Sequence, residues 1–414
     1  MSGIKLSICI PTYNREAYLR NALEHCEIYS FDFPYEIVIS DNASTDNTAQ
    51  VVEEFIAKGL PIRYHRRAVN GGPYKNIAST FRHAVGEYSI YLADDDFLIS
   101  DGVNAAVAYL DANSDVSACH ASWYLYDEIA DRDLTTFYKV DEDIKFGRHD
   151  FVEVFQFIFE RHIFPEIAIY RSSALRSVWV PRDFCFCFFA YLAHVLDQGG
   201  VAFLKQPFYR SVVNSKLATN RSQAGNEEVM VAWDKYRGGL EYFLYMAAKR
   251  GKLNTGPESR AIFEQMCKVF TLNRMAVAVR FWAVRKDFIK AYELYTRMAL
   301  GGMADHPEVA ALRESFPMLV AMQTLAYQVS ATAGVDRLVL SGMADPALIT
   351  ELLRDVGLGP EIEVIADLDD SASTEVESTM IFAADMARRE KFLELGYKPN
   401  MIFIESDLTQ HILI

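Results

Sequence analysis

Three adjacent carboxylates, Asp94, Asp95 and Asp96, are the residues of this chain whose types and spacing best suit chemistry. They follow residues 88–92, an apolar stretch with the composition of a buried strand. Side chains of an extended segment alternate in direction, so Asp94 and Asp96 are expected to point the same way. Two carboxylates on one side suit Mg²⁺ or Mn²⁺. Phosphate oxygens and water would complete the coordination shell of the ion. The alternative is an acidic turn that contacts only solvent.

Strands and helices alternate through the first hundred residues. Strand-like stretches at residues 5–10, 36–40, 62–65 and 88–92 are separated by segments with helical character. This alternation predicts an α/β domain with a parallel sheet, and ligands of such sheets bind beyond the carboxyl ends of the strands. The side chains expected at that edge are Asn14, Asp41, Arg66, Asn70 and the three Asp residues.

These strand ends resemble the family 2 glycosyltransferases, which have the GT-A fold. The matching segments are 7–15 (SICIPTYNR), 38–46 (VISDNASTD), 70–72 (NGG), 75–76 (KN), 86–88 (GEY) and 94–96 (DDD). The resemblance covers about the first 215 residues and is strongest before residue 100. It implies a Rossmann-like nucleotide-diphospho-sugar transferase domain.

The resemblance also implies which residues hold the nucleotide-sugar. Asp41 would contact the base, although its sequence is also good turn and cap chemistry. Arg66 would reach the diphosphate, although a solvated basic residue is an open alternative. The nucleotide-sugar-binding residues implied by the match are Pro11, Thr12, Tyr13, Asn14, Arg15, Asp41, Asn42, Arg66, Asn70, Gly71, Asn76, Asp94, Asp95 and Arg210.

The family's metal motif is Asp-x-Asp or a variant that ends in Asp-Asp, and residues 94–96 fit both forms. By this resemblance Asp96 would be the direct ligand of Mn²⁺ or Mg²⁺. Asp94 would contact the ribose or a metal-bound water. A divalent ion would act as a Lewis acid toward the negative charge that builds on the departing phosphate.

The match weakens where the family places its catalytic base. Many members have Glu-Asp at the start of a helix, and here the pair is Arg182-Asp183. We expect Asp183 to be the base, with helix capping as its alternative role and Glu166 as the second candidate. Arg210, near the end of the resembling region, would close over the diphosphate or form a surface ion pair.

Charge divides the 414-residue chain into three parts. Residues 1–215 carry a net charge of −10, residues 216–333 a net charge of +5, and residues 334–414 a net charge of −10. The middle part has helical composition, and Asp287 is expected to cap one of its helices. The last part alternates strand and helix without the Gly-x-Gly-x-x-Gly fingerprint, which predicts a small Rossmann-like α/β domain without a dinucleotide site.

We therefore expect a cytoplasmic, metal-dependent, inverting glycosyltransferase of polysaccharide or glycoconjugate synthesis. Six scattered Cys residues indicate a reducing compartment, and the chain shows no signal peptide and no apolar run long enough to span a bilayer. The expected partners are a nucleotide-sugar donor and a saccharide, lipid-linked or protein acceptor, but no nucleic acid. Peripheral contact with the inner face of the cell membrane and self-association are further candidates. The alternative function is a non-catalytic nucleotide-sugar-binding or scaffold protein.

Overall fold

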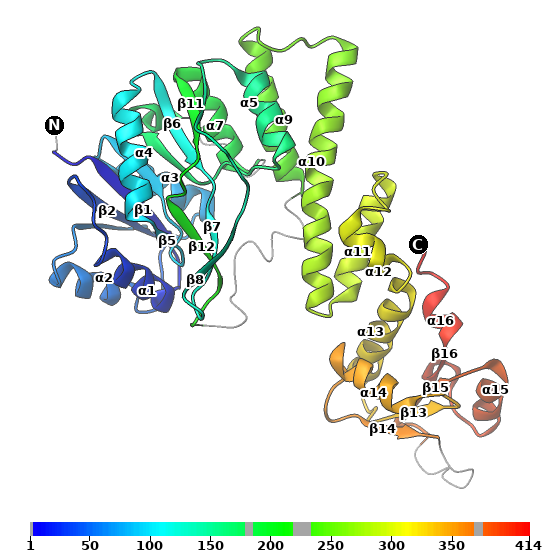
Figure 1. Ribbon diagram of the computed structural model, residues 1–414. Helices are drawn as coiled ribbons and strands as arrows, with labels where there is room; N and C mark the ends of the chain where they lie inside the picture. Colours follow the sequence, from blue (N-terminus) through cyan, green and yellow to red (C-terminus); the bar gives the residue numbers. More distant parts are fainter. Residues whose placement is uncertain (1–2, 179–184, 218–232, 368–375) are drawn as a thin grey trace. The chain divides into compact units, whose positions relative to one another are not determined.

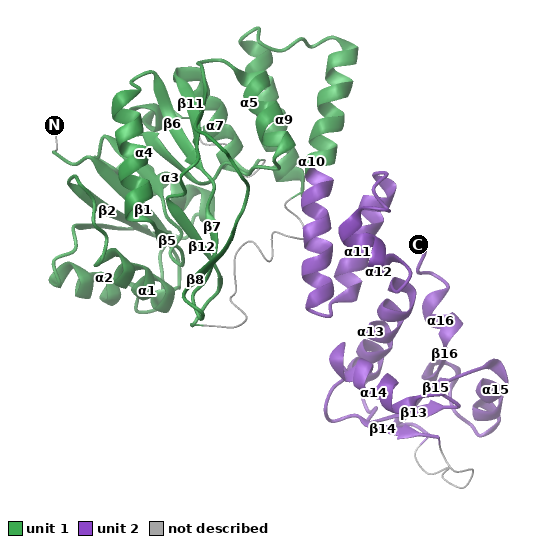
Figure 2. Cartoon of the chain, viewed as in Figure 1, with its two compact units in different colours: residues 1–270 green, residues 271–414 purple. Residues whose placement is uncertain are grey.

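The computed structural model describes residues 3–178, 185–217, 233–367 and 376–414. The chain forms two compact units, residues 1–270 and residues 271–414 (Figure 2). The division falls within helix α10 (Pro257–Val284). The domain boundaries near residues 215 and 334 stay predictions based on charge and composition.

The first unit is built on an eight-stranded mixed sheet (Figure 1). In sheet order its strands are β3 (Ile62–Arg66), β2 (Tyr35–Asp41), β1 (Leu6–Thr12), β4 (Tyr88–Tyr91), β10 (Ala168–Arg171), β6 (Val116–Ala121), β11 (Gly200–Leu204) and β9 (Ile144–Phe146). Strand β10 runs antiparallel to both of its neighbours, and β9 runs antiparallel to β11. The predicted α/β class is confirmed, and the four strands of the first hundred residues are parallel as predicted. The later strands β10 and β9 make the whole sheet mixed.

Nine helices accompany this sheet in the described part of the first unit. They are α1 (Glu16–Cys26), α2 (Thr48–Ala57), α3 (Pro73–His83), α4 (Ser100–Ala112), α5 (Phe151–Glu160), α6 (Ser172–Arg176), α7 (Cys187–Gln198), α9 (Trp233–Lys249) and α10. The core is apolar and continuous from the central strands to α7 and α9. Burial of this apolar surface is the main force that holds the strand ends in register.

A second, four-stranded sheet lies in the same unit. Its strands, in order, are β5 (Phe97–Leu98), β12 (Tyr209–Asn214), β7 (Tyr124–Asp127) and β8 (Arg132–Thr136). Strand β5 begins one residue after Asp96 and pairs antiparallel with β12. This sheet therefore joins the acidic run to residues more than one hundred positions later in the chain.

The second unit contains helices followed by an all-parallel sheet. Its helices before the sheet, beyond the end of α10, are α11 (Phe288–Leu300), α12 (Pro307–Arg313) and α13 (Phe316–Ala331). The sheet region comprises β13 (Arg337–Ser341), α14 (Pro346–Asp355), β14 (Glu363–Ala366), β15 (Thr379–Ala383), α15 (Met386–Glu394), the 3₁₀ turn η1 (Pro399–Met401), β16 (Ile402–Ile404) and α16 (Glu405–Thr409). Asp287 caps α11 as expected, because its side chain accepts from the backbone N–H of Lys290. The sheet order β14-β13-β15-β16 agrees with the predicted Rossmann-like tail.

Among the described residues, no helix has both the length and the apolar character needed to cross a membrane.

Candidate functional site

The carboxyl ends of β1, β2, β3 and β4 meet at one edge of the sheet, because these four strands are parallel. The loop after β1 is fixed there by Asn14, whose backbone N–H donates to Ser44 Oγ at 2.9 Å. The Asn14 side-chain oxygen accepts from the Thr45 N–H at 2.7 Å. Asn14 has a φ of 51°, a conformation that Asn tolerates better than most residues. Thr12 and Arg15, which flank this anchor, are consequently held at the sheet edge.

Asp41, at the end of β2, is fully buried and has its own set of donors. Tyr64 Oη donates to one carboxylate oxygen at 2.6 Å, and the Ser44 N–H donates to the other at 2.8 Å. Arg66 lies 3.6 Å from the same carboxylate and also donates to the Ser44 carbonyl. The hydrogen bond from the Ser44 N–H is the turn interaction that the sequence analysis gave as the alternative role of Asp41. Tyr64 is an additional member of the site.

Asn42 shapes the glycine turn that follows β3. Its amide nitrogen donates to Asn70 Oδ1 at 2.7 Å, and its oxygen accepts from the Gly71 N–H at 2.9 Å. Gly72 has a φ of 84°, which only glycine adopts without strain. Asn76 is buried and donates to the backbone carbonyls of Thr12 and of Ser40, at 3.1 and 2.9 Å. The structure thus uses both amide side chains to join loops, and their contact with a nucleotide stays a prediction.

Arg15 joins the first loop to the acidic run. Its Nε donates to Asp94 Oδ1 at 2.9 Å, and its Nη2 pairs with Asp95 Oδ2. The other Asp94 oxygen accepts from Thr12 Oγ1 at 2.7 Å. Two carboxylates therefore converge on one guanidinium group at the carboxyl edge of the sheet.

The electrostatics of this cluster are unusual. Burial raises the pKa of Asp94 to about 6, and the neighbouring charge of Asp95 acts in the same direction. The charge of Arg15 and the hydrogen bonds from Arg15 and Thr12 oppose that rise in pKa. A nearby positive charge is therefore needed to keep Asp94 ionised at neutral pH.

Asp96 has different partners from its two neighbours in the run. Its Oδ2 accepts from Tyr209 Oη at 2.9 Å, and its Oδ1 accepts from the Val212 N–H at 2.8 Å. Both donors lie on β12, and Asp96 is 8% exposed. The alternation that pointed Asp94 and Asp96 the same way fails here, because the chain turns after Ala93 rather than staying extended.

The residues present fit a divalent cation. Asp94 and Asp95 supply hard carboxylate oxygens and already hold one positive group, the Arg15 guanidinium. Over the described ranges, no set of three or more His, Cys, Asp or Glu side chains is arranged to hold a metal ion. Two carboxylates with phosphate oxygens from a bound ligand form the donor set that Mg²⁺ commonly uses.

Glu166 reaches the same edge because β10 is antiparallel. Ile169 pairs with Ile90, so the turn before β10, which contains Glu166, lies toward the carboxyl end of β4. Burial raises the pKa of Tyr138, and the nearby charge of Glu166 adds to the rise. The carboxyl group of this candidate base therefore lies among aromatic side chains beside the acidic run.

The other two late candidates have different outcomes. Asp183 lies outside the described residues, so its role stays a prediction. Arg210 forms a two-point ion pair with Asp133, at 2.7 and 2.8 Å, and lies over the Tyr126 ring. This pair is the alternative that the sequence left open for Arg210, and its expected contact with the diphosphate stays untested.

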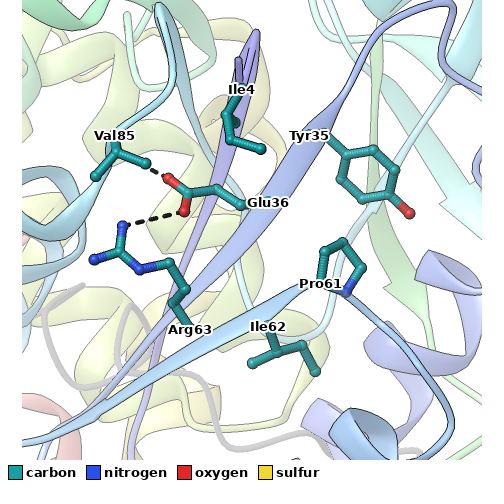
Figure 3. Close-up of a pocket in the computed structure, with 7 residues that line it drawn as sticks. All are labelled: Ile4, Tyr35, Glu36, Pro61, Ile62, Arg63 and Val85. Atoms are coloured by element: carbon teal, nitrogen blue, oxygen red, sulfur yellow. Dashed lines mark hydrogen bonds and ion pairs between the residues drawn. The ribbon is translucent and has the colours of Figure 1, made fainter. Parts of the chain in front are cut away.

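A separate hollow of about 680 Å³ lies at the opposite edge, near the amino ends of β2 and β3 (Figure 3). Its polar group, Glu36, accepts from the Val85 N–H at 2.8 Å and from Arg63 Nη1 at 3.1 Å. Ser7 Oγ donates to the same carboxylate at 2.6 Å. Because these bonds tie three strands and the residues before β4 together, Glu36 serves the fold.

Sequence reasoning missed Tyr64 and Tyr209 as members of the site. Tyr64 had a detectable signal, because residues 64 and 66 share one face of β3 and Arg66 is adjacent to Asp41. Tyr209 had none, because its contact with Asp96 spans 113 residues.

Comparison with known proteins gives this arrangement its context. The family model "Glycosyl transferase family 2" matches residues 7–179. Abequosyltransferase RfbV of Salmonella typhimurium is 38% identical over 118 residues, which are 28% of this chain and 35% of the relative. Poly(ribitol-phosphate) β-N-acetylglucosaminyltransferase TarS of Staphylococcus aureus is 34% identical over 118 residues, which are 27% of this chain and 20% of the relative.

Solved structures are similar over a longer stretch. The crystal structure of S. aureus TarS 1–349 with UDP-GlcNAc has a TM-score of 0.47 and 17% identity. That alignment covers 76% of this chain and 92% of the solved chain. The family match contains the first loop, Asp41, the glycine turn, the acidic run and Glu166. Residues 7–179 are thus similar to glycosyltransferase family 2, and the first unit that contains them has an α/β fold built on a mixed sheet.

Proposed function

We propose that this protein is a glycosyltransferase that moves a sugar from a nucleotide-sugar donor to an acceptor hydroxyl. The observation that carries the proposal is the convergence of Asp41, Asp94, Asp95 and Arg15 at the carboxyl edge of a family 2 domain. The family match, and relatives named as sugar transferases, support this reaction class.

In this proposal each part of the edge has one role. Asp41, with Tyr64 beside it, forms the site for the nucleotide base, and Arg66 reaches the diphosphate. Asp94 and Asp95 hold Mn²⁺ or Mg²⁺, and Asp96 positions the run through its bonds to β12. When bound, the divalent ion supplies a positive charge that stabilises the leaving diphosphate. Thr12 keeps Asp94 oriented by its hydrogen bond.

The donor side is tested by nucleotide binding. Thermal unfolding is measured with UDP, GDP, CDP or dTDP, each with Mn²⁺ and with a chelator. We expect one nucleotide to raise the melting temperature more in Mn²⁺ than in chelator, because ligands that bind only the folded state stabilise it. The absence of stabilisation by all four nucleotides would contradict the proposal, and equal stabilisation in chelator would contradict its metal requirement.

The acceptor base is Asp183 or Glu166, and the transfer inverts the anomeric centre. An inverting displacement needs a carboxylate within hydrogen-bond reach of the acceptor hydroxyl. We expect Asp183→Asn to lower turnover by about 10²–10⁴-fold, the usual share of general-base catalysis, while donor binding is retained. The matched variant is Glu166→Gln, and whichever variant causes that loss identifies the base. Nucleotide binding without transfer to any acceptor would support the scaffold alternative.

The setting we propose is bacterial polysaccharide or glycoconjugate synthesis at the inner face of the cell membrane. The names of the two relatives, an abequosyltransferase and a poly(ribitol-phosphate) glycosyltransferase, support a saccharide or polyol-phosphate acceptor. Residues 216–333, with a net charge of +5, are our candidates for acceptor docking or self-association. Light scattering of the full chain at micromolar concentration tests self-association.

A further inference from the structure

Arg15 forms more polar contacts with the acidic run than the other residues of its loop. Its guanidinium group is bonded to Asp94 through Nε and to Asp95 through Nη2, and it lies 4.2 Å from the centre of the Tyr18 ring. The Arg15 side chain is 20% exposed, and those of Asp94 and Asp95 are 8% and 11% exposed. This is a largely buried ion cluster, in which the loss of one partner leaves an uncompensated charge.

The backbone on both sides of Arg15 is fixed, and the guanidinium end of its side chain makes the contacts with the acidic run. Asn14 is anchored to Ser44 and Thr45, as described above. The Glu16 N–H donates to Asp46 Oδ2 at 3.1 Å, and Glu16 Oε2 accepts from the Asn47 N–H at 2.7 Å. The guanidinium group can therefore leave the carboxylates by rotation of its side chain, without movement of the loop.

We propose that Arg15 is an internal counter-ion that competes with the divalent ion for Asp94 and Asp95. This inference rests on the proposed function, because it assumes that these two carboxylates bind the metal. In the metal-free protein Arg15 neutralises them, and in the loaded protein its guanidinium group vacates the same oxygens. Arg15 is a positioning residue in this scheme, since it acts through the carboxylates.

The competition follows from which atoms are available. Arg15 covers Asp94 Oδ1 and Asp95 Oδ2, and Thr12 Oγ1 covers Asp94 Oδ2. A cation that binds both carboxylates competes with these donors for the same negative charge. Thr12 is neutral, whereas Arg15 carries the charge that a divalent cation repels, so Arg15 is the group that leaves. Apparent metal affinity is then lowered by the stability of the Arg15 cluster.

The test measures Mn²⁺ binding directly, by electron paramagnetic resonance of free Mn²⁺ titrated into the full-length protein without nucleotide. The variants are Arg15→Gln and Arg15→Lys, and far-ultraviolet circular dichroism confirms that each is folded. Arg20→Gln is the matched control, because Arg20 lies in α1, the helix that begins directly after Arg15, pairs with Glu54 and carries the same charge.

We expect Arg15→Gln to bind Mn²⁺ about 10-fold more tightly than wild type, a factor that corresponds to one charge-assisted hydrogen bond. Arg15→Lys should fall between the two, because lysine keeps the charge but not the two-point fork. Arg20→Gln should match wild type. Without metal, Arg15→Gln should melt at a lower temperature and gain more from Mn²⁺.

Three results would overturn the inference, and they are distinguishable. If wild type binds Mn²⁺ and Arg15→Gln binds it equally well or more weakly, Arg15 does not compete with the metal. The proposed function would then still stand. An absence of Mn²⁺ binding in both proteins, with and without nucleotide, would remove the metal requirement and this inference together. Tighter binding in Arg20→Gln as well would assign the effect to net charge and would also overturn the role of Arg15.

Discussion

Two variants, Asp96→Asn and Asp95→Asn, test which acid of the run stabilises the fold and which one binds the proposed cation. Asp96 is bonded to Tyr209 and to Val212 on β12, whereas Asp95 pairs with Arg15. Family resemblance assigned the direct metal contact to Asp96, and the contacts of the folded chain favour Asp95. The two variants differ by one position and each removes one negative charge.

The cost of Asp96→Asn follows from its two donors. An amide oxygen can accept from Tyr209 Oη or from the Val212 N–H, and the amide nitrogen would face the other donor. Loss of one hydrogen bond to a charged group costs about 1.5–3 kcal/mol. With about 2–4 °C per kcal/mol for a domain of this size, the melting temperature should fall by roughly 3–12 °C. Asp95→Asn loses an ion pair but relieves repulsion with Asp94, so its melting temperature should change less.

The assays are thermal unfolding without metal and Mn²⁺ titration of the folded proteins. We expect Asp95→Asn to weaken Mn²⁺ binding by 10-fold or more, roughly the effect of one charged ligand. Tyr209→Phe provides the control, because it removes a donor to Asp96 without touching a carboxylate. If Asp96→Asn abolishes Mn²⁺ binding at an unchanged melting temperature, while Asp95→Asn binds normally, Asp96 is the direct ligand and the reasoning is refuted.

Three further predictions concern side chains around the edge and in the core. Tyr64→Phe removes the 2.6 Å donor to buried Asp41 and should cost about 1–3 kcal/mol of unfolding free energy and weaken nucleotide binding; unchanged urea midpoint and affinity would contradict it. Arg210→Gln breaks the ion pair with Asp133 and should lower the melting temperature without changing the KM for the donor. A tenfold rise in that KM would instead support the expected contact of Arg210 with the diphosphate. Burial lowers the pKa of His120 to about 4, so the unfolded chain takes up a proton first as pH falls. The free energy of unfolding should therefore fall by about 3 kcal/mol between pH 6.5 and pH 4. In urea titrations, His120→Phe should show a smaller fall over this pH range. An equal fall in the variant would exclude His120 as its cause.

The strand ends could be predicted from sequence because local signals specify them. The apolar runs predicted as strands coincide closely with β1, β2, β3 and β4, and each is followed by polar or glycine-rich residues. Parallel pairing brings the carboxyl ends of these strands together. The expected helices after the first three strands are present, as α1, α2 and α3. These elements depend on periodicity and turn chemistry within short windows of sequence.

The partners of the acids could not be predicted, because they come from distant segments. Arg15 and Asp94 are 79 residues apart, and Asp96 and Val212 are 116 apart. The direction of Asp96 depends on the pairing of β5 with β12, a second sheet that no local pattern indicated. The expectation that Asp94 and Asp96 point the same way required an extended chain through residues 94–96. The chain turns there, so the expectation does not apply.

The pairing of these acids also explains how an acidic edge can accept an anionic ligand. Asp41, Asp94, Asp95 and Asp96 all lie at or beside the carboxyl ends of β2 and β4, where four unpaired charges would repel a diphosphate. Asp41 accepts a hydrogen bond from Tyr64 and lies beside Arg66, and Asp94 and Asp95 form ion pairs with Arg15. Asp96 accepts hydrogen bonds from β12. Binding of a divalent ion at Asp94 and Asp95 would add two positive charges to this edge and would reduce its repulsion of a diphosphate. The same step would release a guanidinium group beside the bound ligand, so that both cations would act on the anion together.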